Sequence, residues 1–221
     1  MITQKRKLLL SNINKIGSII TLTEALEMMH KYQNQVPDGV GSVLYNRELL
    51  DKLLTVPGCL GIRLVNAIHE GYHSLVLMAV DSHNKNILQY NTEEAPIAGK
   101  GGITPYYNPW ESSIPVSNQT GELISEAVAN KMIKEYQDLK PGTIKSNLYG
   151  RELIETLLSA PGCKGLRLFN GIAEDGDHKF VLVPVDEMHN AIGKCQVTTT
   201  AGMFFFDPPI GDGGHACPPY C

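Results

Sequence analysis

Three residues near the C-terminus have side chains that could hold a metal ion. His215, Cys217 and Cys221 place one imidazole and two thiols within seven residues, and these are ligand types that Zn²⁺ prefers. Their spacing matches no standard zinc motif. If Pro218 and Pro219 adopt polyproline geometry, the two cysteine Cα atoms lie roughly 12 Å apart, whereas a disulfide requires about 4.4–6.8 Å. We therefore expect a reduced, metal-free and mobile tail, with a zinc or thiol-redox site as the alternative.

Two arginines within apolar segments form a second candidate site. Arg63 and Arg167 lie among apolar neighbours, and Asp81 and Asp186 end the next apolar segment of each copy. The guanidinium fork matches the geometry of a carboxylate, so each arginine could bridge an aspartate across a sheet or clamp a ligand carboxylate. An enzyme with its active site between two parts of the chain would use these four residues. We favour the structural bridge.

The cysteines outside the tail and the Gly-rich segments give no catalytic signature. Cys59 and Cys163 each follow a Pro-Gly pair. A nucleophilic cysteine requires a base and a lowered pKa, and nothing local pairs either thiol with a histidine, so we interpret both as small buried residues at tight turns. The chain has no HExxH, phosphate loop or nucleotide fingerprint, and Gly99-Lys100-Gly101-Gly102 lacks the flanking strand and helix that a phosphate loop requires.

Two further pairs occur at equivalent positions. Arg47-Glu48 recurs as Arg151-Glu152. A functional charge pair is one interpretation, but we favour an exposed helix start, where a glutamate interacts well with the positive end of the helix dipole. His73 and His178 occupy equivalent positions beside a turn, and we expect both to face solvent.

These matched pairs belong to an internal repeat. Tyr32-Gln33 recurs as Tyr136-Gln137, 104 residues later, and about half of the positions between 32 and 68 are identical to their mates. The segment 57–64 (PGCLGIRL) recurs as 161–168 (PGCKGLRL). Chance does not produce such a match over this length, so the sequence indicates a tandem duplication.

The spacing within the repeat changes by one residue and thereby locates a turn. Val80-Asp81 matches Val185-Asp186, which is 105 residues later. The extra residue falls in a polar, Gly-bearing stretch between Ile68 and Leu75 and its mate. An insertion is tolerated at a hairpin tip but not within a paired strand. The sequence therefore predicts a β-hairpin at this position in each copy.

Hydrophobic periodicity predicts the remaining elements. In the first copy we expect helices over 22–35 and 46–55, then strands over 61–68, 75–80 and 87–90. In the second copy we expect a helix over 124–139 and strands over 181–185 and 196–206. The residues expected to be buried are Leu49, Leu53, Leu54, Ile62, Leu64, Leu75 and Leu77, with mates Leu153, Leu157, Leu158, Leu166, Leu168, Phe180 and Leu182.

These elements define an α+β fold built from a duplicated helix–helix–strand–strand–strand unit, with helices packed on antiparallel sheet. The run 75–80 is apolar on both faces and requires cover on both sides, so we expect the copies to pack as a pseudo-twofold pair. The expected divisions are an N-terminal segment 1–20, copy one 21–92, a Gly/Pro-rich connector 93–119, copy two 120–210 and a cysteine-containing tail 211–221. We interpret the connector as a plain linker, with a functional loop as the alternative.

Composition excludes several classes of partner. The net charge is −4, which gives no electrostatic attraction for nucleic acid or an anionic membrane. No apolar run approaches the roughly 20 residues that span a bilayer, and the N-terminus has no secretory apolar stretch. We expect a cytoplasmic protein, in which the five cysteines stay reduced unless they bind metal.

Several strings resemble an uncharacterised family of small α+β proteins from Bacteroidetes. They are 148–152 (LYGRE), 161–167 (PGCKGLR), 181–186 (VLVPVD) and the tail 217–221 (CPPYC). The resemblance consists of PGCxGIR and LVLVxVD motifs and a C-terminal CPPxC-type tail. It implies no function, but it implies that the tail belongs to the protein. Copy one departs from the family pattern by ending in the connector, so any role of the tail would belong to copy two.

Absence of a catalytic signature favours a non-catalytic interaction module with an unidentified protein partner. The alternatives are a metal or thiol-redox protein that uses the tail, an enzyme with a site between the copies, and a precursor cleaved after Gly213-Gly214. No cofactor is expected, with zinc as the alternative. A dry apolar seam between the copies would favour the interaction module, and a polar cleft would favour the enzyme.

Overall fold

The computed structural model describes residues 13–87, 98–100, 102–105, 121–143, 145–192, 195–199, 202–206, 210–212 and 215–217. Its helical elements are η1 (Ile13–Lys15), α2 (Leu22–Gln35), α3 (Arg47–Leu54), α4 (Glu126–Leu139) and α5 (Arg151–Leu158). Its strands are β1 (Ser18–Ile20), β2 (Val40–Asn46), β3 (Gly61–His69), β4 (Tyr72–Val80), β5 (Ala98–Lys100), β6 (Gly102–Pro105), β7 (Glu122–Ile124), β8 (Ser146–Gly150), β9 (Gly165–Ile172), β10 (His178–Val185), β11 (Cys195–Thr199), β12 (Gly202–Phe206), β13 (Ile210–Asp212) and β14 (His215–Cys217).

The strands form two six-stranded sheets and a separate two-stranded sheet. Sheet A has the order β1-β13-β10-β9-β2-β6, and sheet B has the order β14-β8-β3-β4-β5-β7. Neighbouring strands are antiparallel in both, and β11 pairs with β12 in the two-stranded sheet. The predicted α+β class with antiparallel sheets is confirmed.

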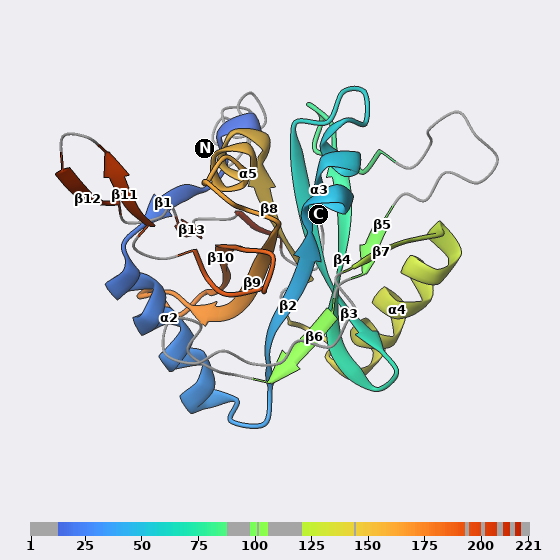
Figure 1. Ribbon diagram of the computed structural model, residues 1–221. Helices are drawn as coiled ribbons and strands as arrows, with labels where there is room; N and C mark the ends of the chain where they lie inside the picture. The colour runs from blue at the N-terminus through green and yellow to red at the C-terminus, as the bar shows by residue number, and fades with distance from the viewer. Residues whose placement is uncertain are drawn as a thin grey trace, which may run out of the picture.

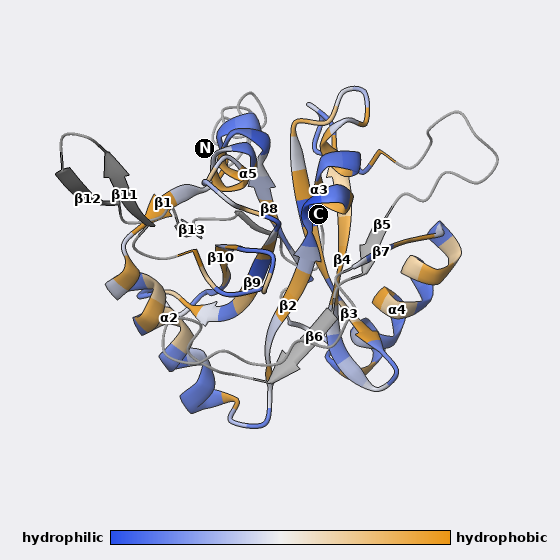
Figure 2. Cartoon of the chain, in the orientation of Figure 1, coloured by the Kyte–Doolittle hydropathy of each residue, from blue (hydrophilic) through white to orange (hydrophobic). Residues whose placement is uncertain are grey.

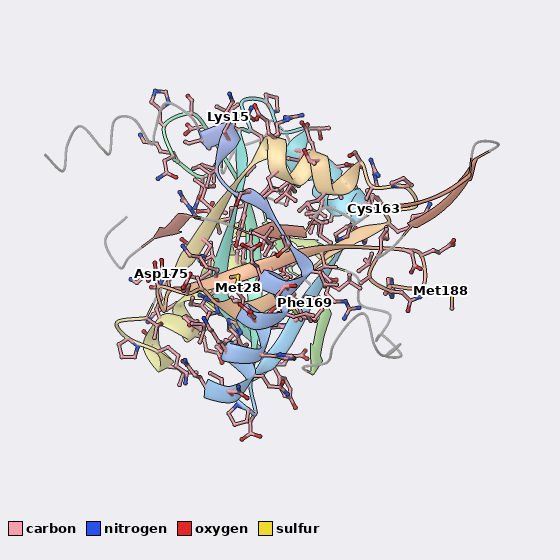
Figure 3. All side chains as sticks on the ribbon, turned by 90° about the vertical axis from the view of Figure 1, so that its left-hand side faces the viewer. Lys15, Met28, Cys163, Phe169, Asp175 and Met188 are labelled. Atoms are coloured by element: carbon pink, nitrogen blue, oxygen red, sulfur yellow. The ribbon has the colours of Figure 1, made fainter. Side chains whose placement is uncertain are left out.

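Helices α2 and α4 cover the outer faces of the two sheets, on opposite sides of the molecule (Figure 1). Met28 of α2 packs with Phe169 of β9 on sheet A, and the two side chains lie close together in Figure 3. Ala129 and Met132 of α4 pack with Val76 on sheet B. Helices α3 and α5 lie together at one end of the sheets (Figure 1).

The main apolar core lies between the sheets and beneath α3 and α5. It combines the apolar stripes of both helices with inner-face residues of β3, β4, β9 and β10. Figure 2 shows polar residues on the outward surface of α3 and apolar residues along β4 beside it. All fourteen residues expected to be buried are buried. This core gives the run Leu75–Val80 the two-sided cover that its sequence requires, because α4 covers the other face.

Local signals explain where the helices begin and end. Thr21 caps α2 and forms a reciprocal capping box with Glu24, which satisfies two free backbone N–H groups. Asn46 caps α3 by accepting from the Leu49 N–H at 2.8 Å. After α3, Gly58 has φ +81, a left-handed conformation that glycine adopts without strain. The helix predicted over 22–35 is confirmed to the residue, and the others agree within one or two residues.

The first half of the chain (residues 13–105) and the second half (121–217) exchange strands. Strand β2 lies in sheet A and pairs with β9, whereas β8 lies in sheet B and pairs with β3. A Cβ on Gly61 of β3 would lie 2.6 Å from the backbone oxygen of Tyr149 on β8, so this close pairing requires glycine. The expected helix–helix–strand–strand–strand order has no strand where β2 and β8 occur, between the two helices of each copy, and that order is wrong.

The connector also contributes to both sheets. Strand β5 pairs with β4 in sheet B, and β6 pairs with β2 in sheet A. In the same manner, β13 pairs with β10 in sheet A and β14 pairs with β8 in sheet B. The interpretation of 93–119 as a plain linker is therefore wrong for the described residues 98–100 and 102–105, which are paired strands.

The predicted hairpins are confirmed, and two other strand predictions need correction. Each hairpin turn contains a left-handed glycine, Gly71 with φ +83 and Gly176 with φ +87. The strand expected over 196–206 is two antiparallel strands, β11 and β12. In place of a strand over 87–90, Asn86 forms an isolated bridge with Val80, and 88–90 lie outside the described residues. None of the described helices is long and apolar enough to cross a membrane.

Candidate functional site

Arg47 and Arg151 form reciprocal hydrogen bonds between the two central helices. Arg47, at the start of α3, donates through Nη1 to the Leu158 carbonyl at the end of α5, at 2.7 Å. Arg151, at the start of α5, donates through Nη1 to the Leu54 carbonyl at the end of α3, also at 2.7 Å. Each arginine thus satisfies a carbonyl that a helix end leaves without an intrahelical partner. The sequence predicted only an exposed helix start at these positions and gave no indication of this role.

Both arginines also have an acidic neighbour one helical turn away. Arg47 Nε lies 3.3 Å from Asp51, and Arg151 Nε lies 2.7 Å from Glu155. Glu48, by contrast, pairs with Lys52 at 2.7 Å, and the interaction with Lys52 lowers the pKa of the Glu48 carboxyl. Arg47 and Glu48 therefore do not act as a pair. Glu48 interacts with Lys52 on its own helix, whereas Arg47 connects α3 to α5.

Arg63 is held by the loop after β4. Its Nη1 donates to the Asn86 side chain at 2.6 Å, and its Nη2 contacts both the carbonyl and the side chain of Asn84. Asp81 instead accepts the backbone N–H groups of His83 and Lys85. Desolvation raises the pKa of its carboxyl, but these bonds and the charges of His83 and Lys85 together hold that pKa below the usual value. The expected bridge to Asp81 is therefore replaced by contacts to the loop that Asp81 organises.

Arg167 lies in a different environment although it is the mate of Arg63. Its side chain is completely buried, and Nη1 lies 3.5 Å from the Ser42 hydroxyl on β2. Asp186 accepts the N–H groups of Met188 and Asn190, just as Asp81 organises its own loop. Arg63 lies on sheet B and Arg167 on sheet A. Arg63, Asp81 and Asp186 bond to loop residues, whereas Arg167 contacts β2.

Cys59 and Cys163 occupy the structural role that the sequence predicts. Both are buried free thiols, and each Sγ lies 3.3 Å from the carbonyl of the glycine two residues later, Gly61 or Gly165. Burial raises the pKa of both thiols. A raised pKa lowers the fraction of nucleophilic thiolate, so this arrangement does not activate either cysteine.

Two tyrosines join the sheets across the core. Tyr45 of β2 donates its hydroxyl to the Leu75 carbonyl of β4 at 2.7 Å, and Tyr149 of β8 donates to the Phe180 carbonyl of β10 at 2.8 Å. The Phe180 N–H in turn donates to the Tyr149 hydroxyl at 3.0 Å. Tyr45 belongs to the first half of the chain and Tyr149 to the second, and each hydroxyl bonds to backbone groups in the opposite sheet.

At the hairpin end of the core lies a polar cluster that brings both halves together. His73 Nε2 lies 2.8 Å from Asn66 Oδ1, and its ring centroid lies 5.5 Å from that of Tyr136 on α4. Burial lowers the pKa of His73 to about 4, and repulsion from His178 and Lys140 contributes. His73 therefore does not face solvent freely, contrary to expectation.

His178 repeats this arrangement on the other sheet. Its Nε2 lies 2.9 Å from Asn170 Oδ1, and its ring centroid lies 5.7 Å from that of Tyr32 on α2. Burial lowers the pKa of His178 to about 4 as well. Burial also raises the pKa of Tyr32, with a contribution from Tyr136. The expectation that His178 faces solvent is wrong too. The occurrence of a histidine at the same position in both copies was the sequence feature that could have indicated a shared role.

The tail is described in part. His215, Ala216 and Cys217 form β14, which pairs with 146–148 on β8, so these three tail residues belong to sheet B. Cys221 lies outside the described residues. Within the described part of the chain, no group of three potential metal ligands comes together. The zinc hypothesis for His215, Cys217 and Cys221 stays untested.

The comparisons with known proteins add no relative. No family model matches this chain, and neither a curated protein nor a solved structure is similar to it. The geometry alone must support a function. It shows an apolar seam between the sheets, two histidines with lowered pKa values at its hairpin end, and three arginines, Arg47, Arg63 and Arg151, bonded to helix ends or a loop.

Proposed function

We propose that this protein is a non-catalytic interaction module, built as a tandem duplication whose halves interlock about a pseudo-twofold axis. The observation that supports it is the fate of the chemically capable side chains. Arg47, Arg63 and Arg151 hold helix ends and loops, and Cys59 and Cys163 are buried with raised pKa values. Residues used in this manner stabilise a scaffold and leave the surface to provide function.

The duplication is supported by correspondence between the sheets. Read outward from β2 and β8, sheet A runs β9, β10, β13, β1 and sheet B runs β3, β4, β5, β7. The segment 99–102 (GKGG) matches 211–214 (GDGG), and each segment contains the end of one strand, β5 or β13. This match extends the proposed repeat into the connector and the tail, which were expected to differ from one another.

We propose a protein as the partner and the cytoplasm as the compartment. The net charge of −4 offers no attraction to polyanions. Cys59 and Cys163 are free thiols, which suits a reducing compartment.

The proposal is tested by identifying and then reconstituting a partner. Full-length protein is cross-linked in its native host, the enriched protein is purified, and binding is measured with both components pure. We expect saturable binding that survives a metal chelator and the Cys217→Ser/Cys221→Ser variant. Loss of binding under either condition, or failure of every enriched protein to bind when pure, would contradict the proposal.

The rival function is a metal or thiol-redox protein that uses His215, Cys217 and Cys221. Metal analysis of protein purified without an affinity tag separates it from the interaction module. We expect less than about 0.1 zinc per chain, against one per chain for a structural site. Stoichiometric metal that disappears in Cys217→Ser would replace our proposal with this one.

A further inference from the structure

Two histidines join the two halves of the chain at the hairpin end of the core. The ring of His73, from the first half, contacts Tyr136 of the second half. The ring of His178, from the second half, contacts Tyr32 of the first half. Each imidazole is therefore held by a hydrogen bond within its own hairpin and by an aromatic ring from the other half.

The polar groups around the histidines also bind across elements. Asn170 accepts from His178 Nε2 through its Oδ1 and donates through its Nδ2 to the Val40 carbonyl of β2 at 2.8 Å. Asn147 of β8 in sheet B donates to the His178 carbonyl of sheet A at 3.3 Å. Hydrogen bonds thus connect His178 to β2 and β8, the two exchanged strands.

The surroundings of the pair favour neutral imidazoles. Among the described residues, the facing groups are Tyr32 from α2, Tyr136 from α4, Phe180 from β10, the two asparagines and, after α4, the cation Lys140. Nearby hairpin carboxylates are engaged elsewhere, since Glu70 lies 3.8 Å from His69 and Asp177 lies 3.9 Å from Lys179. Within the described residues, neither imidazole forms an ion pair with a carboxylate.

We propose that His73 and His178 form a proton-operated latch, which holds the hairpin ends of the two halves together while neutral and releases them when protonated. Protonation places two like charges near each other and near Lys140, without a counter-ion and partly out of water. The opposite end of the core, closed by α3, α5 and the two arginines, contains no such pair among its described residues and stays packed.

The direction of the pH effect follows from linkage. Both histidines have a pKa of about 4 when folded, and about 6.5 when unfolded. The unfolded state therefore binds more protons below pH 6.5, so stability is complete above that pH and is lost as the pH falls toward 4. At pH 5, each histidine reduces the folding equilibrium constant about 30-fold relative to pH 7.5.

The test compares full-length wild type, the double variant His73→Gln/His178→Gln and the control His83→Gln. His83 has a side chain that is 80% exposed, so its variant should follow wild type. Denaturant midpoints are measured between pH 7.5 and 5.0, above the range in which most carboxyls titrate. We expect the double variant to lose the pH dependence of wild type. A wild type without pH dependence, or a double variant that keeps it, overturns the latch.

Two measurements on wild type keep the test decisive if the double variant folds poorly. NMR titration should show two imidazoles with pKa values near 4, whereas values near 6.5 for both would overturn the proposal. Amide hydrogen exchange at pH 5 should accelerate in the β3–β4 and β9–β10 hairpins before it does in α3 and α5. Equal acceleration throughout would indicate global acid unfolding and would also overturn it.

Discussion

At the scale of single residues, the arginines show how a side chain suited to catalysis can serve the fold instead. A guanidinium has five N–H donors in a planar fork, and Arg47 and Arg151 use that fork to reach a helix neighbour and the end of another helix together. Lysine has a single compact ammonium group, which cannot bond to the acidic neighbour and to the end of the other helix at the same time. The residue type at 47 and 151 thus follows from the geometry between α3 and α5.

Removing either arginine should destabilise the protein. Arg47→Ala or Arg151→Ala leaves a helix-end carbonyl without its charged donor, so we expect a loss of about 1–2 kcal/mol in the free energy of unfolding, at the lower end because both side chains are about one-third to one-half exposed. Lys52→Ala is the control, since Lys52 and Glu48 form an exposed pair, and removing an exposed pair should leave the free energy of unfolding nearly unchanged. Equal effects of all three variants in denaturant titrations would contradict the role of the arginines.

The cysteines give a second prediction at this scale. We expect five free thiols when protein isolated without reductant is denatured and titrated with a thiol reagent. Cys59 and Cys163 are buried with raised pKa values and should react slowly in the native state. A count of three or fewer would mean that the tail forms a covalent or metal-bound clasp.

At the scale of elements, predictability follows local signals. Helix α2 has a capping box and an apolar period, and the hairpins have left-handed glycines. The sequence alone therefore predicts both the helix and the hairpins. Strand β2 has no such boundary, because Asn46 is both its last residue and the N-cap of α3. Strands β5 and β13 are short and contain glycine, which is rare in strands. Their order depends on pairing with residues distant in the chain, which a local pattern cannot reveal.

The central helices give a prediction at this scale. Leu53 and Leu157 are 2% and 0% exposed and face the core between the sheets. Leu53→Ala or Leu157→Ala should therefore reduce the free energy of unfolding by about 2–5 kcal/mol, through lost transfer energy and a residual cavity. Leu139→Ala serves as the control, because Leu139 is 62% exposed at the end of α4 and should change stability by about 0.5 kcal/mol or less. Values near zero for both core variants would contradict the placement of α3 and α5.

At the scale of the whole molecule, the repeat predicts two similar units but cannot predict how they pair. Strands β3 and β9 are equivalent in the two copies and have similar sequences. Strand β2 would therefore meet nearly the same side chains whether it paired with β3 or with β9. The same ambiguity hid the candidate site, since His73 reaches Tyr136 and His178 reaches Tyr32 only when each hairpin lies against the other half. Sequence identifies the equivalent residues, and the choice between separate and interlocked units depends on chain geometry over long distances.

Interlocked halves should remain together when the chain between them is cut. Strand β2 pairs with β9 and β8 pairs with β3, and Arg47 and Arg151 bind across the same interface between the halves. We therefore expect full-length protein with a protease site inserted between 111 and 119 to keep its circular dichroism spectrum after cleavage. Both fragments should elute as one species at micromolar concentration and separate in denaturant. The uncut variant should unfold in a single transition, as one cooperative unit does. Fragments that separate without denaturant, or two unfolding transitions, would show that the exchanged strands do not hold the halves together.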